Sequence, residues 1–203
     1  MTQAQNKEPG DHNSPQPPRE NVWVEILKTL GLSAVLAFGI RTFVAEARFI
    51  PSKSMEPTLL VEDRLIVDKV SYHFKEPQRG DIVVFMPPDK ASDVCTGKIT
   101  PSKDAYIKRV IGLPGETVAV REGRVYINDR PLQEDYIRTP SYQYGPKVVK
   151  QGEYLVLGDN RDNSCDSHSW GFVPRDNIIG RAVVRFWPLD RVGGISPEPK
   201  YDN

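Results

Sequence analysis

The sequence predicts an all-β domain attached to one N-terminal transmembrane helix, and three observations support this. One long apolar run, residues 23–44, lies near the N-terminus. The rest of the chain contains short runs of branched and aromatic residues bounded by turn residues, which is typical of strands. Proline (18) and glycine (15) are frequent among the 203 residues, which favours strands and turns over helices.

The N-terminal part divides into a polar tail and an apolar helix. Residues 1–22 are polar and proline-rich, with too little apolar surface to fold, so we predict a disordered tail. A helix over residues 23–44 would span about 30 Å, one hydrocarbon thickness, which predicts a transmembrane segment. Lys28 and Arg41 lie near its ends, where long side chains can reach the membrane surface.

A cleaved signal peptide is the alternative for this apolar run. Only residues 29–40 are free of charge, and Ala45-Glu46-Ala47 has the small-x-small pattern of a cleavage site. We favour an uncleaved anchor, because cleavage there would leave Ser54, a candidate nucleophile, close to a free terminus. The positive charges on the two sides of the span balance, so they do not predict its orientation.

Composition excludes several classes of function. Lys+Arg and Asp+Glu are both 27, so no basic field points to nucleic acid as a partner. Two cysteines, Cys95 and Cys165, are too few for a disulfide scaffold, although they can form one bridge in an oxidising compartment. The chain has no CxxC motif and no His/Cys cluster, so we expect no metal and no cofactor.

The strand candidates all lie within residues 45–203, which are enough for one domain with its own core. A hairpin is predicted from residues 116–120 and 124–127, which flank a glycine-containing turn. Gly180 is a candidate bulge, and the tail from residue 193 is expected to be loose. The other predicted strands are residues 64–70, 81–85, 154–157 and 178–186.

Three segments are candidates for chemistry. Ser54 follows the apolar span closely, Lys108 lies inside an apolar run, and residues 158–164 form a dense polar turn after a predicted strand. A serine hydroxyl needs a base to become a good nucleophile. Lysine can be that base only when burial keeps its amine neutral.

Each of these segments also has an ordinary explanation. Lys108 can point out of a half-buried strand, and Ser54 can belong to a simple turn. The polar turn at 158–164 can be solvated, or it can bind calcium, although the spacing of an EF-hand is absent. His168 with Asp166 offers a Ser-His-Asp arrangement as a further alternative.

Four boxes follow the apolar span in a fixed order. They are Ser52-x-Ser54-Met55-x-Pro57-Thr58-Leu59, Arg79-Gly80-Asp81-Ile82-Val83, Tyr106-Ile107-Lys108-Arg109 and Gly158-Asp159-Asn160-Arg161. Together they resemble bacterial type I signal peptidases over roughly residues 35–188. The stretch Ser164-x-Asp166-Ser167-His168-x-Trp170-Gly171 is similar to cyanobacterial and plastid members. Many relatives have an arginine where this chain has His168, and a pair of His168 with Asp166 would be weaker and pH-sensitive.

The resemblance implies a role for each matched residue. Ser54 would be the nucleophile, Lys108 the general base, and Ser164 would orient the lysine amine. The Ser52 hydroxyl and the Ser54 main-chain N–H would form the oxyanion hole. The remaining implied residues are Ile50, Met55, Leu59, Tyr106 and Ile107 for substrate binding, and Asp159, Arg161 and Asp166 for loop support.

The two cysteines lie close to these segments in sequence. Cys165 directly follows Ser164, and Cys95 precedes the strand that carries Lys108. If Lys108 and Ser164 touch, the cysteines are neighbours and a bridge between them becomes geometrically feasible. Two unrelated thiols are the alternative.

We therefore expect an antiparallel β-sheet peptidase domain with a Ser/Lys dyad over residues 45–203, with an inserted cap at about 117–152. The resemblance implies that it removes signal peptides from exported preproteins after small-x-small sites, through an acyl-enzyme. Its partners would be preproteins and the lipid bilayer. It would lie in the cell membrane or the thylakoid membrane, with a cytoplasmic N-terminus and the domain on the exported side.

Two other functions stay open at this point. A self-cleaving Ser/Lys protease of the repressor type shares the dyad, but residues 1–22 cannot form the DNA-binding domain that such proteins carry. A membrane-tethered β-domain that only binds a partner is the other. Cleavage of a small-x-small peptide would distinguish these possibilities.

Overall fold

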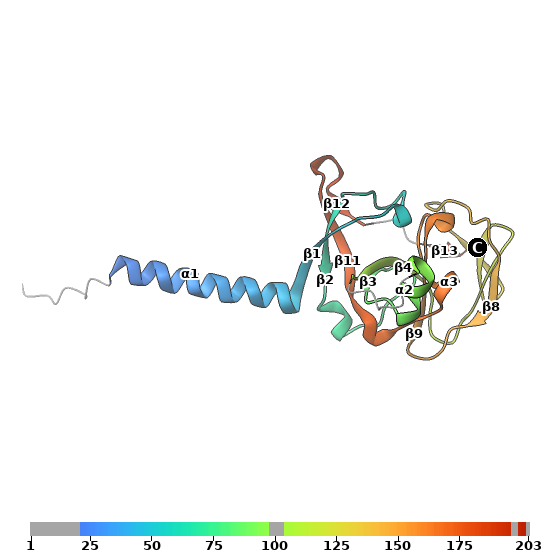
Figure 1. Cartoon of the computed structure of the whole chain (residues 1–203), viewed down its shortest axis with the longest axis horizontal. Helices are drawn as coiled ribbons and strands as arrows, with labels where there is room; N and C mark the ends of the chain where they lie inside the picture. Colours follow the sequence, from blue (N-terminus) through green and yellow to red (C-terminus); the bar gives the residue numbers. More distant parts are fainter. Residues whose placement is uncertain (1–20, 98–103, 196–198, 202–203) are drawn as a thin grey trace, which may run out of the picture. The chain divides into compact units, whose positions relative to one another are not determined.

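The computed structural model describes residues 21–97, 104–195 and 199–201 (Figure 1). The chain divides into two compact units, Met1–Phe38 and Gly39–Asn203. The disordered tail predicted for residues 1–22 lies almost entirely outside the described residues.

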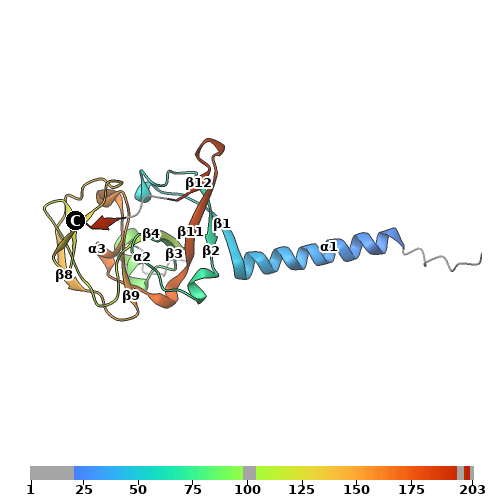
Figure 2. The same ribbon diagram turned by 180° about the vertical axis from the view of Figure 1, so that it is seen from behind.

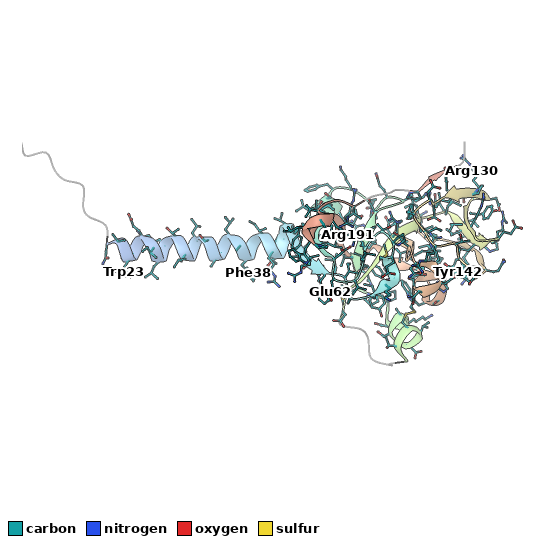
Figure 3. All side chains as sticks on the ribbon, turned by 90° about the horizontal axis from the view of Figure 1, so that it is seen from above. Trp23, Phe38, Glu62, Arg130, Tyr142 and Arg191 are labelled. Carbon is teal, nitrogen blue, oxygen red and sulfur yellow. A yellow bond between two sulfur atoms is a disulfide. The ribbon has the colours of Figure 1, made fainter. Side chains whose placement is uncertain are left out.

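The first unit contains the helix α1 (Val22–Gly39), in which no residue is buried. Trp23 and Phe38, labelled in Figure 3, point away from the helix and are 73% and 71% exposed. Helical backbone continues through a π-helical turn at Ile40–Val44, so the apolar helical span is Val22–Val44. An exposed apolar helix of this length fits a membrane anchor.

The second unit is built on an eight-stranded sheet, in which every pairing between described strands is antiparallel. Its strands are β1 (Ala45–Phe49), β2 (Arg64–Asp68), β3 (Ile82–Phe85), β4 (Tyr106–Gly112), β9 (Glu153–Leu157), β10 (Val173–Pro174), β11 (Ile178–Trp187) and β12 (Gly193–Gly194). Their order is β1-β2-β11-β3-β4-β9-β10, and β12 pairs with β11. The predicted bulge is present, because the register of β11 against β3 shifts between Ile178 and Gly180. The prediction of an antiparallel all-β domain is confirmed.

A smaller sheet of five strands is called the cap sheet here. Four of its strands lie within residues 117–152, the range predicted for an inserted cap, and the fifth, β13, lies near the C-terminus. Its order is β13 (Lys200–Tyr201), β7 (Arg130–Gln133), β6 (Arg124–Ile127), β5 (Thr117–Arg121) and β8 (Tyr144–Val148). Figures 1 and 2, seen from opposite sides, both place it at the end of the domain away from β1 and β2. The predicted hairpin is β5 and β6, whose turn residues Glu122 and Gly123 have positive φ. The tail from residue 193, expected to be loose, contributes β12 and β13.

Three clusters of buried apolar side chains occupy the described part of the domain. The first joins β3, β4 and β9 to two short helices, α2 (Asp89–Thr96) and α3 (Ser167–Trp170), through contacts such as Phe85 against Trp170. The second joins the cap sheet to β4 and β9. The third contains Ile50, Met55, Leu59, Leu65, Ile82 and Ala182, and Ile107 of β4 packs against it. Since β4 contributes to all three clusters, its position is fixed from several sides.

Candidate active site

Ser54 and Lys108 meet although they are far apart in the sequence. Ser54 lies in a 3-10 turn, Lys53–Met55, and Lys108 lies within β4. The Lys108 Nζ atom is 2.8 Å from Ser54 Oγ and 3.0 Å from the main-chain oxygen of Ile107. Ser54 is 7% exposed and Lys108 is 5% exposed. A hydroxyl and an amine are thus in hydrogen-bond contact in a site that largely excludes water.

Burial changes the acidity of this amine. It lowers the pKa of Lys108 from 10.5 to about 8, although the carboxylates of Asp166 and Asp159 act in the opposite direction. A neutral amine can accept the proton of the serine hydroxyl, whereas a protonated amine cannot. The site can therefore activate Ser54 as a nucleophile at moderately alkaline pH. The alternative that Lys108 points out of a half-buried strand into solvent is wrong, because its side chain is buried.

The side chain of Ser52 adds a second hydroxyl to this site. Its Oγ atom lies 3.3 Å from Ser54 Oγ, and Ser52 is exposed where Ser54 is buried. A hydroxyl beside the nucleophile and open to solvent is placed where it can donate to an oxyanion that forms at the carbonyl under attack.

Ser164 lies beside the nucleophile without a hydrogen bond to the lysine. Its Oγ atom is buried and has no hydrogen-bond partner among the described residues. Gly158 lies between the two serines, because a Cβ atom on this glycine would collide with Ser164 Oγ and with the main-chain oxygen of Ser54. The structure thus brings Ser164 to the site, and its role in orienting Lys108 stays a prediction.

The turn that begins at Gly158 contacts the nucleophile turn directly. The main-chain N–H of Asn160 donates to the oxygen of Ser54 (3.1 Å), and its side-chain amide donates to the oxygen of Lys53 (3.0 Å). Asn160 lies in one of the boxes quoted from the sequence, but the sequence assigned it no role. Long-range contacts of this kind have no signal in a single sequence.

Asp159 and Arg161, the predicted loop supports, each hold one buried ion pair. Both Asp159 oxygens accept from Arg109, at 2.8 and 2.7 Å, and these two side chains are almost completely buried. Arg161 pairs with Glu134, and it also donates to the main-chain oxygen of Gly158 (3.1 Å). Arg109 and Glu134 were not among the predicted site residues.

Asp166, the third predicted support, holds the other side of the turn. One of its oxygens accepts from the N–H of Gly158 (2.8 Å), and the other lies 2.7 Å from His168 Nδ1. The His168 ring stacks on Tyr142 with 4.2 Å between centroids. Since the hydrogen bonds of His168 go to Asp166 and Ser169, whereas Ser54 Oγ contacts Ser52 and Lys108, the geometry favours a lysine base over a histidine base.

The five predicted substrate-binding residues divide between two faces of β4. Ile50, Met55 and Leu59 are at most 1% exposed and form one cluster, against which Ile107 packs. Tyr106 is the neighbour of Ile107 in the strand, so its side chain points to the opposite face. There it packs edge-on against Phe85, with 6.3 Å between ring centroids.

The structure contains a disulfide between Cys95 and Cys165, whose Cα atoms are 5.8 Å apart. It links α2 to the residue that directly follows Ser164. In the part of the chain that the structure describes, no group of three or more His, Cys, Asp or Glu side chains is placed to hold a metal ion.

Comparisons with known proteins identify the family. Residues 23–187 match the family described as "Signal peptidase, peptidase S26". Signal peptidase I of Leptolyngbya laminosa is 59% identical over 195 residues, covering 95% of this chain and 94% of that protein. Probable signal peptidase I-2 of Synechocystis is 57% identical over 177 residues, covering 87% of this chain and 78% of that protein.

In two further comparisons, the matched region covers a smaller share of one of the two proteins. Thylakoidal processing peptidase 1, chloroplastic, of Arabidopsis thaliana is 40% identical over 173 residues, covering 85% of this chain and 51% of that protein. A crystal structure of a signal peptidase I from Enterococcus faecalis has 32% sequence identity and a TM-score of 0.43, covering 53% of this chain and 97% of that chain. With the family matched over most of its length, the chain belongs to the signal peptidase I family of serine endopeptidases, which remove signal peptides from exported proteins.

Proposed function

We propose that this signal peptidase acts through a dyad in which Ser54 is the nucleophile and Lys108 is the general base. The observation that carries the proposal is the 2.8 Å contact between Lys108 Nζ and Ser54 Oγ in a buried site. The lowered pKa of Lys108 supports it, because a base must be neutral before it can take a proton.

In the first step, Ser54 Oγ attacks the scissile carbonyl carbon and its proton moves to Lys108 Nζ. The oxyanion that forms accepts hydrogen bonds from the Ser52 hydroxyl and the Ser54 main-chain N–H. Lys108 then gives the proton to the leaving amine, the peptide bond breaks, and an acyl-enzyme ester remains on Ser54. In the second step Lys108 takes a proton from water while the water oxygen attacks the ester carbonyl. Lys108 then returns the proton to Ser54 Oγ as the ester bond breaks, which releases the carboxyl product and restores the free enzyme. Ser164 would keep the lysine amine directed at the reacting atoms.

The substrates of this proposal are exported preproteins with small-x-small cleavage sites. Ile50, Met55, Leu59, Tyr106 and Ile107 would line the shallow apolar pockets that accept the small side chains. The close packing of Ile50, Met55, Leu59 and Ile107 would leave little space for larger ones.

We also propose that the span Val22–Val44 anchors the enzyme in the cell membrane, or in the thylakoid membrane, with the N-terminus in the cytoplasm or stroma. This topology places the peptidase domain on the exported side, where signal peptides emerge. The exposed apolar helix supports the anchor. Protease added to sealed vesicles of known orientation tests the topology, because it should digest the domain only from the exported side.

Cleavage of a separate preprotein by the full chain in detergent micelles tests the dyad. Ser54→Ala and Lys108→Ala should each abolish cleavage, whereas His168→Ala should leave substantial activity. Lys147→Ala, which removes an exposed lysine from β8, is the matched control. A folded but inactive His168→Ala variant beside an active Lys108→Ala variant would favour a histidine base. Chains that cleave only themselves would favour the self-cleaving alternative.

A further inference from the structure

We infer that Glu134, assisted by Tyr136, is a positioning residue of the active site that acts through Arg161 on the oxyanion hole. Glu134 belongs to the segment that follows β7, at the border of the cap sheet. The inference rests on the proposed role of Ser54, because its effect is exerted on the main chain of that residue.

One oxygen of the buried Glu134 carboxylate is held by two hydrogen bonds. Its Oε1 atom accepts from Arg161 Nη2 (2.5 Å) and from the hydroxyl of Tyr136 (3.0 Å). The side chains of Arg161 and Glu134 are 0% and 2% exposed. Burying an ion pair adds little to stability, because desolvation offsets most of the attraction. A role in fixing geometry therefore explains this pair better than a role in stability.

The segment of Glu134 holds the neighbouring turn at three places. Arg161, paired with Glu134, donates to the oxygen of Gly158 (3.1 Å). The N–H of Arg138 donates to the oxygen of Asp159 (3.3 Å), within an isolated bridge between Arg138 and Asn160. In addition, the guanidinium of Arg109, which chelates Asp159, lies 4.2 Å from the centre of the Tyr136 ring. Residues 134–138 thus fix the turn at 158–161 from its outer side.

On its inner side, this turn controls the orientation of one peptide group. The side-chain amide of Asn160 donates to the oxygen of Lys53. That oxygen belongs to the same planar peptide group as the N–H of Ser54. A planar group cannot rotate at one end only, so the bond to Lys53 also sets the direction of the Ser54 N–H. This N–H is the proposed main-chain donor to the oxyanion.

These contacts form one continuous path from Glu134 through Arg161 and Asn160 to the oxyanion hole. Each link is a hydrogen bond or a direct continuation of the main chain. Releasing Glu134 should leave the substrate pockets in place and misdirect the donor. Because the oxyanion exists only in the transition state and intermediate, the loss should fall on kcat and spare KM.

The test uses the full chain in detergent micelles with a preprotein-derived peptide. Glu134→Gln keeps the shape of the side chain and removes its charge. We expect kcat to fall by about tenfold or more, with KM changed by less than about twofold. Asp129→Asn is the matched control, because Asp129 is an exposed acid of the cap region that pairs with an exposed arginine. Its kcat and KM should both stay within about twofold of the wild type.

A double-mutant cycle tests the path through Arg161. Adding Glu134→Gln to Arg161→Gln should lower kcat little further, since both changes break the same link. Additive losses would overturn the path through Arg161. A folded Glu134→Gln variant with wild-type kcat would overturn the whole inference, provided that Ser54→Ala is inactive. Activity in Ser54→Ala would instead refute the proposed function.

The inference can still be tested if the Glu134→Gln variant does not fold. If Glu134→Gln shows no cooperative thermal transition, Tyr136→Phe replaces it, because it deletes one hydroxyl and leaves the ring beside Arg109. We expect its kcat to fall by about threefold with KM unchanged, the loss of one modest hydrogen bond to the carboxylate. A wild-type kcat in that variant would overturn the inference.

Discussion

Asn160 and Ser54 are joined by a main-chain hydrogen bond of 3.1 Å, from the N–H of Asn160 to the oxygen of Ser54. The Asn160 side chain adds a second bond to the adjacent residue, Lys53. The nucleophile turn is therefore held on both of its peptide groups by one residue from a distant part of the chain.

Replacing Asn160 with alanine should separate these two bonds. Asn160→Ala removes the amide that holds Lys53 but keeps the main-chain bond to Ser54. We expect kcat to fall by about tenfold or more, which is less than the roughly 100- to 1,000-fold cost of removing an oxyanion-hole donor outright. Steady-state kinetics and thermal unfolding of the same sample measure this. Asn163→Ala, which truncates an exposed side chain in the same polar turn (158–164), is the control; equal losses in both variants would contradict the prediction.

The rate should rise with pH through about 8 and level off above it. Burial lowers the pKa of Lys108 to about 8, so the amine is protonated, and inactive as a base, below that value. Each pH unit further down should lower kcat/KM by about tenfold. Asp166 raises the pKa of Lys108, so Asp166→Asn should shift the midpoint to lower pH. A profile of kcat/KM that is already flat from about pH 5 would exclude a lysine base.

Gly158→Ala should inactivate the enzyme although it adds only one methyl group. The added Cβ would collide with Ser164 Oγ and with the main-chain oxygen of Ser54, so the turn must move away from the nucleophile. A displacement of about 1 Å can cost about 100-fold in rate. Gly194→Ala is the control, because no atom lies near its Cβ position. Comparable kinetics in both variants would show that the turn can move without loss of activity, and would contradict the prediction.

Reduction of the Cys95–Cys165 disulfide should lower activity without modifying Ser54. The bond ties α2 to the residue after Ser164, and the cysteines are 70 residues apart, which in chain-entropy models is worth about 4 kcal/mol. Activity before and after reductant, with a count of free thiols, measures the effect. The variant with both cysteines changed to serine controls for direct effects of the reductant and should not respond. Unchanged activity in fully reduced wild type would refute this.

Much of the fold follows from local sequence. The four residues of β3, Ile82–Phe85, are branched or aromatic and all buried, which is the pattern expected of a central strand. The hairpin β5–β6 was predicted from its turn. The helix α2 was not predicted, since Asp89–Thr96 is polar and its place depends on packing against α3 and on the disulfide.

Some residues of the candidate site could be predicted from the sequence, and others could not. Ser54 and Lys108 were singled out by the order of boxes along the chain, whereas the apolar run around Lys108 was also compatible with a side chain that points to solvent. Glu134 lies in the polar run Gln133-Glu134-Asp135, where an exposed loop is the natural interpretation. Its burial follows from Arg161 and Tyr136, which approach it only in the folded domain. Likewise, Tyr106 and Ile107 look alike in the sequence, and only the alternation of β4 separates their faces.

If Lys108 is the general base, as proposed, its burial means that the active site acquires its reactivity by folding. In an extended chain the lysine would keep its ordinary pKa of 10.5 and carry a proton at neutral pH, far from any hydroxyl it could activate. In the folded domain the amine is buried and Ser54 Oγ lies 2.8 Å from it. With that base, we expect a nascent or partly unfolded molecule not to attack peptide bonds around it, so that proteolysis begins only in a completed domain.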